Sequence, residues 1–449
     1  MRFCPIGINY INNMKKLSLL TSLSALVILS GCGLNKGPGG ELTGVSGRHK
    51  FKDDVPYGMV YIPGGTFLMG ATDEDITGAQ LNQSKQVTVS PFYMDETEIS
   101  NNQYRQFVYY VRDSIAAKQM GGEYLVKGSD GNEYINPKKK IDWGNGKKGK
   151  GKTNPSDQLK GMFYDGDDQI FGKKELNVSK LTYNYAWFDW RAAANSNGKA
   201  PRSSFIHKDQ VSVYPDTLVW IKDFAYAQNE PMVKSYFSHP AYDNYPVVGV
   251  TWRQARAFCD WRTKYFEDFR ARQHKPGRGL VSLPSDPQFE WAARGGRVGA
   301  EYPWGGPYIR NAKGCLLANF KPGRGDYASD GGAYTVNVKS YFPNDYGLYN
   351  MSGNVAEWTI SSWTNVFNNF TSDLNPTYSY DAKPTDPAAL KRKIVRGGSW
   401  KDIGYYLQTS TRTYEYQDSA KSYIGFRCVI EALGAGLQNK TNPQHAKHR

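Results

Sequence analysis

The stretch YGLYNMSGNVAEW, residues 346–358, indicates what kind of fold the chain adopts. Glycine, asparagine and aromatic residues follow one another in it without the period of a helix or of a strand. The whole segment beyond residue 296 has this composition, and few periodic segments interrupt it. Long irregular segments need an internal reason to stay ordered, such as a metal ion, a disulfide or a partner. The stretch therefore predicts an α+β domain that is low in regular secondary structure and held together by aromatic packing.

Upstream of residue 296 the sequence predicts short strands and three helices. The runs on either side of Pro63-Gly64-Gly65 in YGMVYIPGGTFLMG (57–70) predict a hairpin. QVTVSPFYMDETEIS (86–100) predicts a second strand pair that ends at a helix start. Serine or threonine followed three residues later by glutamine is typical of a capping box. Three such pairs predict helix starts: Ser100 with Gln103, Thr251 with Gln254, and Ser285 with Gln288.

The first two predicted helices each carry an apolar face. Residues at helical spacing follow the first start at Tyr104, Phe107, Val108 and Val111, and the second at Trp252, Ala255, Phe258 and Cys259. We expect these two faces to lie in the core.

The segment between Tyr109 and Pro246 is mixed in character. Its run PKKKIDWGNGKKGKGK (137–152) is rich in Lys and Gly, which predicts a solvated, flexible loop rather than a phosphate-binding site. Further on, the alternation of Val211, Val213, Leu218 and Trp220 predicts strands. At the C-terminus, residues 432–449 are predicted to be a disordered tail.

The chain of 449 residues is basic, with a formal net charge of +14, and 14% of its residues are aromatic. This charge favours anionic surroundings or partners. No nucleic-acid-binding signature accompanies it, so we expect no nucleic-acid partner. The aromatic residues are expected in the core or at a partner surface.

The segment MKKLSLLTSLSALVILSGC (14–32) has the layout of an export signal, with two lysines before an apolar run that is short for a membrane-spanning helix. Its end, LSGC (29–32), resembles the bacterial lipobox, which implies cleavage before Cys32 and lipid attachment to its sulfur. An ordinary secretory signal that ends in cysteine is the alternative. Gly33 stands where an aspartate would favour inner-membrane retention, so we expect an outer-membrane anchor. Residues 33–54 then predict a flexible tether.

Export places the mature chain in an oxidising compartment, where cysteines tend to pair. After Cys32 only Cys259, Cys315 and Cys428 remain. Since three is odd, at most one bridge forms within the chain.

Eight blocks occur in a fixed order along the chain: GGTFLMG, DETEISNNQYRQF, PVVGVTWRQARAFCDW, LPSDPQFEWAARGG, YPWGG, YGLYNMSGNVAEW, VRGGSW and GFRC. Together they resemble the formylglycine-generating enzyme (sulfatase-modifying factor) family. The resemblance runs from about residue 55 to 431 and is interrupted at about 112–244. It implies the family's complex fold, which is related to C-type lectins and poor in regular structure.

Enzymes of this family oxidise a substrate cysteine with oxygen and a copper ion held by two cysteines after the RGGS[YW] block. The matching positions here are Asp402 and Leu407. Copper(I) requires soft thiolate ligands, which neither residue supplies. We therefore predict no copper and no catalytic residue, and the chain is predicted not to be an enzyme.

The resemblance also implies structural sites. A first calcium set would use Asn319, the Phe320 carbonyl, Asp330 and the Gly332 carbonyl, and a second set would use Asn350, the Gly353 and Val355 carbonyls and Glu357. Such oxygen-only sets suit Ca²⁺, although these polar groups could instead cap turns. A family disulfide would join Cys259 and Cys428, which leaves Cys315 as a buried free thiol.

A closer resemblance is to the lipid-anchored, ring-forming relatives of gliding and type IX secretion machinery, of the GldK/PorK type. It rests on the lipobox followed by ELTGVSGRHKF, on YGMVYIPGG and on YPDTLVWIKDFAYAQNEPM. It implies a non-catalytic lipoprotein that faces the periplasm and forms a ring with a soluble partner subunit of the GldN/PorN type and other secretion components. Aromatic segments 183–190 and 219–227 are candidate contact surfaces. Two alternatives stay open: an oxidase of altered chemistry that uses Asp402, Ser399 or a tyrosine, and a lectin-like binder of envelope glycans.

Overall fold

The computed structural model of the chain describes residues 51, 54–71, 84–128, 133–136, 138–141, 143 and 158–434. The chain divides into two units, 1–52 and 53–449, and the fold lies in the second. The predicted signal at 14–32, Cys32 and nearly all of the tether 33–54 lie outside the described residues, as do most of the run 137–152 and the tail beyond residue 434. Among the helices of the described residues, none combines the length and apolarity needed to cross a bilayer.

Two four-stranded sheets form the centre of the fold. The first has the order β1 (Met59–Ile62), β4 (Phe92–Asp95), β14 (Val429–Glu431) and β9 (Val281–Ser282), and all its pairs are antiparallel. The second has the order β12 (Thr413–Tyr416), β11 (Arg392–Arg396), β10 (Ala356–Ser362) and β13 (Ile424–Gly425), in which only β10 and β13 are parallel. Because β4 pairs with both β1 and β14, strands from the two ends of the domain share one sheet.

The predicted hairpin at 57–70 and the predicted strand pair at 86–100 are wrong. β1 pairs with β4, and β2 (Gly65–Met69) pairs with β3 (Lys85–Val89) in a separate sheet. The segment that contains β1 and β2 thus runs antiparallel to the segment that contains β3 and β4, and each segment bends between its two strands. At the bend Gly64 lies against Pro91, because a Cβ on Gly64 would be 2.8 Å from the proline Cδ. Pro63-Gly64 therefore passes the chain from one sheet into the next and does not turn it back.

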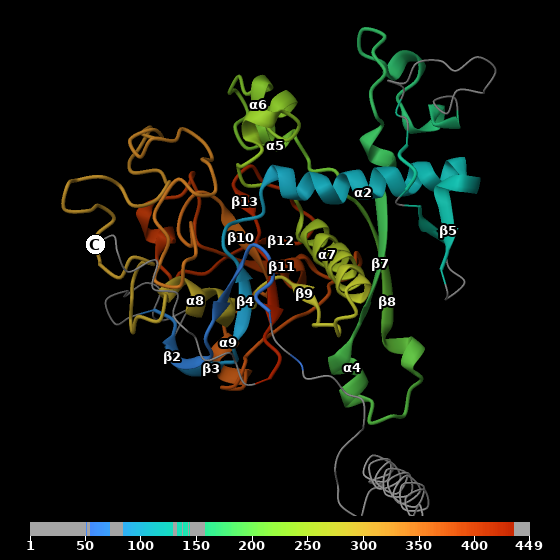
Figure 1. Ribbon diagram of the computed structural model, residues 1–449. Coiled ribbons are helices and arrows are strands. Elements are labelled where there is room, and N and C mark those ends of the chain that lie inside the picture. Colours follow the sequence, from blue (N-terminus) through green and yellow to red (C-terminus); the bar gives the residue numbers. More distant parts are fainter. Residues whose placement is uncertain are drawn as a thin grey trace, which may run out of the picture. The chain divides into compact units, whose positions relative to one another are not determined.

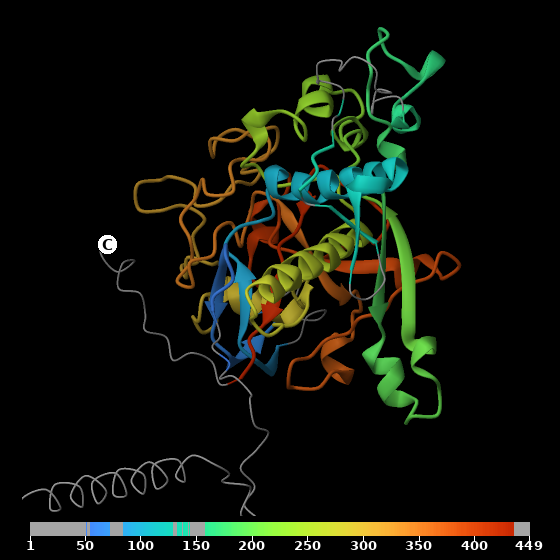
Figure 2. The same ribbon diagram turned by 45° about the vertical axis from the view of Figure 1, so that its right-hand side comes forward.

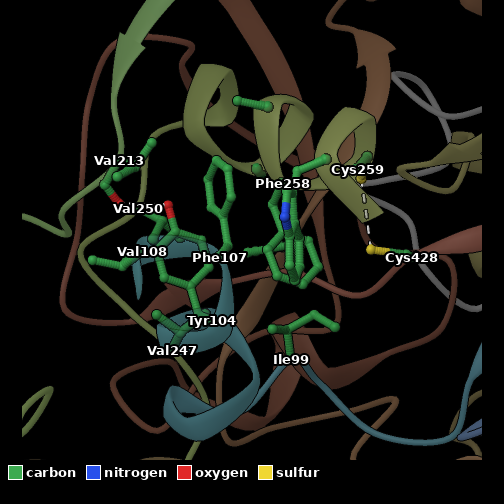
Figure 3. Packing of buried hydrophobic residues seen from close by; sticks show 14 of the residues in the cluster. Ile99, Tyr104, Phe107, Val108, Val213, Val247, Val250, Phe258, Cys259 and Cys428 are labelled. Atoms are coloured by element: carbon green, nitrogen blue, oxygen red, sulfur yellow. Dashed lines mark hydrogen bonds between the residues drawn. The ribbon is translucent and has the colours of Figure 1, made fainter. Parts of the chain in front are cut away.

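All three predicted capping boxes are confirmed. They start α2 (Asn101–Met120), α7 (Trp252–Arg272) and α8 (Asp286–Arg294) directly after Ser100, Thr251 and Ser285. The predicted apolar faces of α2 and α7 are buried and meet in the main core, which Figure 3 shows. There the ring of Tyr104 stacks on Phe258 at 5.6 Å between centroids.

Residues 112–244, called the insertion below, begin inside α2, and we call the rest of the described domain the body. The insertion contains η1 (Gly122–Tyr124), β5 (Leu125–Lys127), β6 (Glu133–Ile135), η2 (Lys160–Met162), η3 (Gly166–Asp168), η4 (Val178–Lys180), β7 (Thr182–Phe188), α4 (Trp190–Asn195), η5 (Arg202–Phe205), β8 (Ile206–Ser212), α5 (Val219–Lys222), α6 (Glu230–Ser235) and η6 (Pro240–Tyr242). β7 and β8 form a long two-stranded ribbon beside α7, with α4 at its far end (Figures 1 and 2).

The strand prediction in the insertion is confirmed in one place and wrong in another. Val211 lies in β8, which pairs with β7. Leu218 and Trp220 instead lie at the short helix α5, where Trp220 is buried and Leu218 is exposed. Their alternation reflects one buried indole rather than the two faces of a strand.

The prediction that the chain beyond residue 296 has little periodic structure holds for residues 297–355, all of them described, which contain no helix or strand. It is wrong for residues 356–431, which contain the strands β10 to β14. The remaining short elements of the body are α9 (Phe367–Phe370), η7 (Ala388–Lys391) and η8 (Gly404–Leu407). The mixture of helix and sheet is therefore confirmed, with a moderate amount of regular structure, which is more than the sequence led us to expect.

Candidate functional site

Three distant segments meet where the blocks of the sequence predict a site. The amide of Gly353 donates to the carbonyl of Gly397 at 2.9 Å, and the amide of Trp400 donates to the carbonyl of Asn354 at 2.9 Å. Asn354 in turn donates its amide to the carbonyl of Asn319 at 2.8 Å. Backbone hydrogen bonds thus join the segment that follows β11 to both predicted calcium segments.

The two positions predicted to replace copper-binding cysteines have different surroundings. Leu407 is fully buried in an apolar cluster with Tyr302, Ala318 and Phe320. Asp402 accepts a hydrogen bond from the Ser399 hydroxyl at 2.6 Å, and burial raises the pKa of its carboxyl above the usual range. One position is therefore apolar and closed, and the other carries a hydrogen-bonded acid.

The insertion covers the indole of Trp400, which directly follows Ser399. Trp220 and Phe224 of the insertion stack on this indole at 6.2 and 5.6 Å between ring centroids. On another side Tyr334 meets the indole edge-on at 5.3 Å. Trp400 is only 1% exposed as a result. No local pattern predicts this cover, because α5 and Trp400 are far apart along the chain.

The first predicted calcium set is gathered in one loop of the body. Asp330 accepts the backbone amides of Phe320 at 2.7 Å and Gly332 at 3.1 Å, and burial raises the pKa of its carboxyl. The side-chain oxygen of Asn319 is buried and accepts no hydrogen bond from the described residues. A buried acceptor without a donor is costly unless a water or a cation satisfies it. This orphaned oxygen fits a cation site.

The second predicted calcium set has different electrostatics. Both carboxylate oxygens of Glu357 accept from Arg427, at 2.6 and 2.7 Å. The amide nitrogen of Asn350 donates to Glu98 at 3.1 Å, and burial raises the pKa of Glu98 to about 8. Because Arg427 already neutralises Glu357, this set fits a cation less well than the first.

The sequence patterns did not single out Glu98 and Arg427. Both residues nevertheless lie inside blocks that carry the family resemblance, Glu98 in DETEIS and Arg427 in GFRC. No group of three or more His, Cys, Asp or Glu side chains gathers in the part of the chain that the structure describes. A cation in either set would therefore be held by one carboxylate together with carbonyl and amide oxygens.

The cysteines are placed partly as predicted. The sulfurs of Cys259 on α7 and Cys428 before β14 lie 3.6 Å apart in the core (Figure 3). Cys315 is exposed, so the prediction that it is buried is wrong, because it lies in a surface turn. The bridge itself stays a prediction, which peptide masses before and after reduction would test.

Each predicted contact segment is divided between core and surface. In 183–190, Tyr185 is 4% exposed and Trp190 is 69% exposed. In 219–227, Trp220 is buried, whereas Tyr226 is fully exposed. Each segment thus offers a few side chains, and not its whole length, for contact.

The ordered blocks of the sequence are those of one class of protein. The sequence matches the family model described as "Sulfatase-modifying factor enzyme 1-like domain" over residues 48–432, and the chain belongs to this family. Among its relatives, the formylglycine-generating enzyme of Mus musculus is 26% identical over 381 residues, which are 84% of this chain and 75% of that protein. The inactive C-alpha-formylglycine-generating enzyme 2 of Mus musculus is 24% identical over 388 residues, 83% of this chain and 86% of that protein. The solved structure of PvdO from Pseudomonas aeruginosa is 16% identical, with a TM-score of 0.44, and the match covers 83% of this chain and 94% of that one.

Proposed function

We propose that the chain is a non-catalytic, structural member of its family. The observation that carries this proposal is Leu407, whose apolar side chain is fully buried at the position where the family's second copper-binding thiol is expected. A leucine offers no lone pair to a metal, and its side chain packs in a cluster with Tyr302, Ala318 and Phe320. The similarity to a relative named inactive is consistent with this proposal.

We further propose that the protein is an outer-membrane lipoprotein of the GldK/PorK type, anchored through Cys32 and facing the periplasm. In this proposal copies of the chain form a ring with a soluble GldN/PorN-type subunit and other components of the type IX secretion and gliding machinery. Closed rings require heterologous contacts, in which two different surfaces of each copy meet. Tyr226 of 219–227 and the exposed Asn184 and Ala186 of 183–190 are available for such contacts.

We propose one structural calcium ion at the first set. The Asn319 side chain, the carbonyls of Phe320 and Gly332, and the Asp330 carboxylate would hold it. Bound there, Ca²⁺ would supply charge compensation for a half-buried carboxylate in a loop without regular structure. The second set remains a prediction.

The test of the ring proposal is electron microscopy of detergent extracts from cells that produce the chain with and without the partner subunit. We expect annular particles, which are lost in the Cys32→Ala variant and in cells without the partner. Monodisperse monomers in every extract would overturn the assembly proposal. Conversion of cysteinyl peptides to aldehydes by the pure protein would overturn the non-catalytic one.

One observation favours a second candidate, an oxidase of altered chemistry. Asp402 is a hydrogen-bonded acid with a raised pKa, and raised carboxyl pKa values are common at active sites. Oxygen consumption with thiol substrates that disappears in Asp402→Asn would favour this candidate. The lectin-like alternative, drawn from the family's relation to C-type lectins, predicts saturable binding of envelope glycans by the monomer.

A further inference from the structure

The ribbon of β7 and β8 is fixed at its base. The Tyr104 hydroxyl donates to the carbonyl of Val213 at 3.0 Å, and the Tyr183 hydroxyl donates to Asp260 at 2.8 Å. Further along the ribbon, the guanidinium of Arg256 on α7 lies 4.9 Å from the ring centre of Trp187. The ribbon is therefore held against α2 and α7 as far as Trp187.

Beyond Trp187 the chain forms what we call the hairpin tip, residues 188–208, around α4 at the far end of the ribbon (Figure 1). The rings of Phe188 and Trp190 are in contact at 4.5 Å between centroids, and Phe205 packs on Phe188 at 6.1 Å. Even so, Trp190 is 69% exposed and Ile206 is 41% exposed. The tip therefore carries an apolar wedge whose position is set by its own aromatic contacts.

The hairpin tip is also basic. Its four exposed cationic side chains are Arg191, Lys199, Arg202 and Lys208. Its single carboxylate is that of Asp189. Asp189 accepts the amide of Ala192 at 2.9 Å as the cap of α4. The next carboxylate, Asp209, forms an ion pair with Arg253 of α7 at 2.7 Å. No residue that the structure describes forms an ion pair with any of the four cations.

We propose that the hairpin tip docks onto an anionic lipid surface. Trp190 and Ile206 would enter the boundary between headgroups and acyl chains, where an indole is favoured because it is amphipathic. The four cations would lie among the lipid phosphates. Tryptophan and arginine are common at both kinds of interface, but lysine is depleted from protein interfaces and typical of membrane-binding surfaces. The exposed Lys199 and Lys208 therefore favour a lipid surface over a protein partner.

This docking gives the domain a contact with the bilayer that does not depend on Cys32. A basic surface with an apolar wedge is a membrane-binding signal that adds to a lipid anchor. The inference stands whether or not the chain forms rings, since it concerns one copy and a lipid surface.

The test is the depth of position 190 in the full chain reconstituted into vesicles. In a Cys315→Ser background, Trp190→Cys is labelled with an environment-sensitive fluorophore, and quenching by brominated lipid is compared in phosphatidylcholine and in mixed phosphatidylglycerol vesicles. We expect quenching several-fold stronger in the anionic vesicles, with loss of that difference in high salt because salt screens the charges. The matched control is Tyr226→Cys, a fully exposed position of the insertion, whose label should stay aqueous in both.

The charge requirement is tested by adding Lys199→Glu and Arg202→Glu to the labelled chain. Both side chains are exposed, and among the described residues the guanidinium of Arg202 has only a cation–π contact with the ring of Phe188, at 5.4 Å from its centre. Circular dichroism should therefore be unchanged while quenching falls to the level in neutral vesicles. Equal quenching in both vesicle types, or full quenching in the charge-reversed chain, would overturn the proposal. A label that is protected only after the partner subunit is added, without lipid quenching, would assign the tip to a protein and overturn it as well.

Discussion

In the body, the guanidinium of Arg396 lies fully buried between Asp286 and Glu290, whereas in the insertion the indole of Trp190 is 69% exposed. Both side chains belong to the same domain. The body fixes its irregular chain with buried charges and amide side chains that are expensive to disturb. The insertion is held by aromatic packing at its base and keeps its tip free. The difference shows that the body is fixed by buried charged contacts, whereas the tip of the insertion leaves large apolar side chains open to solvent.

The largest expected effect comes from breaking the buried ion pairs of Arg396 with Asp286 and Glu290 in the body. Burial alone would raise the pKa of Glu290, but Arg294 and Arg396 outweigh it and hold that pKa below its usual value. Arg396→Met removes one of these charges, and we expect the free energy of unfolding to fall by about 3–5 kcal/mol. Denaturant titration measures this loss.

The matched control lies in the insertion. Lys222 forms an exposed ion pair with Asp216 at 2.7 Å, so Lys222→Met should change the free energy of unfolding by less than about 1 kcal/mol. Equal losses in the two variants would remove the contrast between body and insertion.

The second effect concerns the seam between the two regions. Trp220→Ala removes a buried indole that stacks on Trp400, and we expect it to lower the free energy of unfolding by about 3 kcal/mol. It should also make the segment around Trp400 accessible to proteases. Tyr226→Ala, at an exposed position nearby, should be neutral. A Trp220→Ala protein as stable as the wild type would mean that the insertion contributes little to the stability of the body.

A third, pH-dependent effect comes from Lys393, which is fully buried 3.9 Å from the ring centre of Trp252. Burial lowers its pKa to about 7. The unfolded chain, whose lysine has an ordinary pKa near 10.4, therefore binds more protons above pH 7, so stability rises with pH in that range.

Unfolding at pH 7 and pH 9 tests this sign. We expect the wild type to gain about 2 kcal/mol between these values from this group, and Lys393→Met to lose that gain. An unchanged pH dependence in the variant would assign the slope to other groups.

The smallest expected effect separates the two predicted calcium loops. Calcium at about ten times its dissociation constant should raise the free energy of unfolding by about 1.4 kcal/mol, and a chelator should reverse this. Asp330→Asn should abolish this stabilisation by calcium, whereas Asp326→Asn in the same loop should retain it. Asp326 accepts the backbone amide of Ser329 and lies outside the proposed set. A response that survives Asp330→Asn but not Glu357→Gln would transfer the ion to the second set.

The predictions made from sequence succeeded where the signal is local. The capping boxes at Ser100, Thr251 and Ser285 each act over three residues, and each starts the helix that it predicts. The strand partners were wrong, because Pro63-Gly64-Gly65 has the residues of a turn whether the chain turns back or passes into another sheet. The family match extends over residues 48–432, as eight ordered blocks would lead one to expect.

The helix starts, the family, and the residues that stand at 402 and 407 can all be derived from the amino-acid sequence. The burial of Leu407, the cover of α5 over Trp400, the pairing of Glu357 with Arg427 and the exposure of Trp190 become apparent only in the folded domain. The two groups of properties differ in how far along the chain the interacting residues lie. Capping and helical periodicity depend on neighbours within one or two turns, whereas burial and ion pairing depend on partners tens to hundreds of residues away, which a local pattern does not specify.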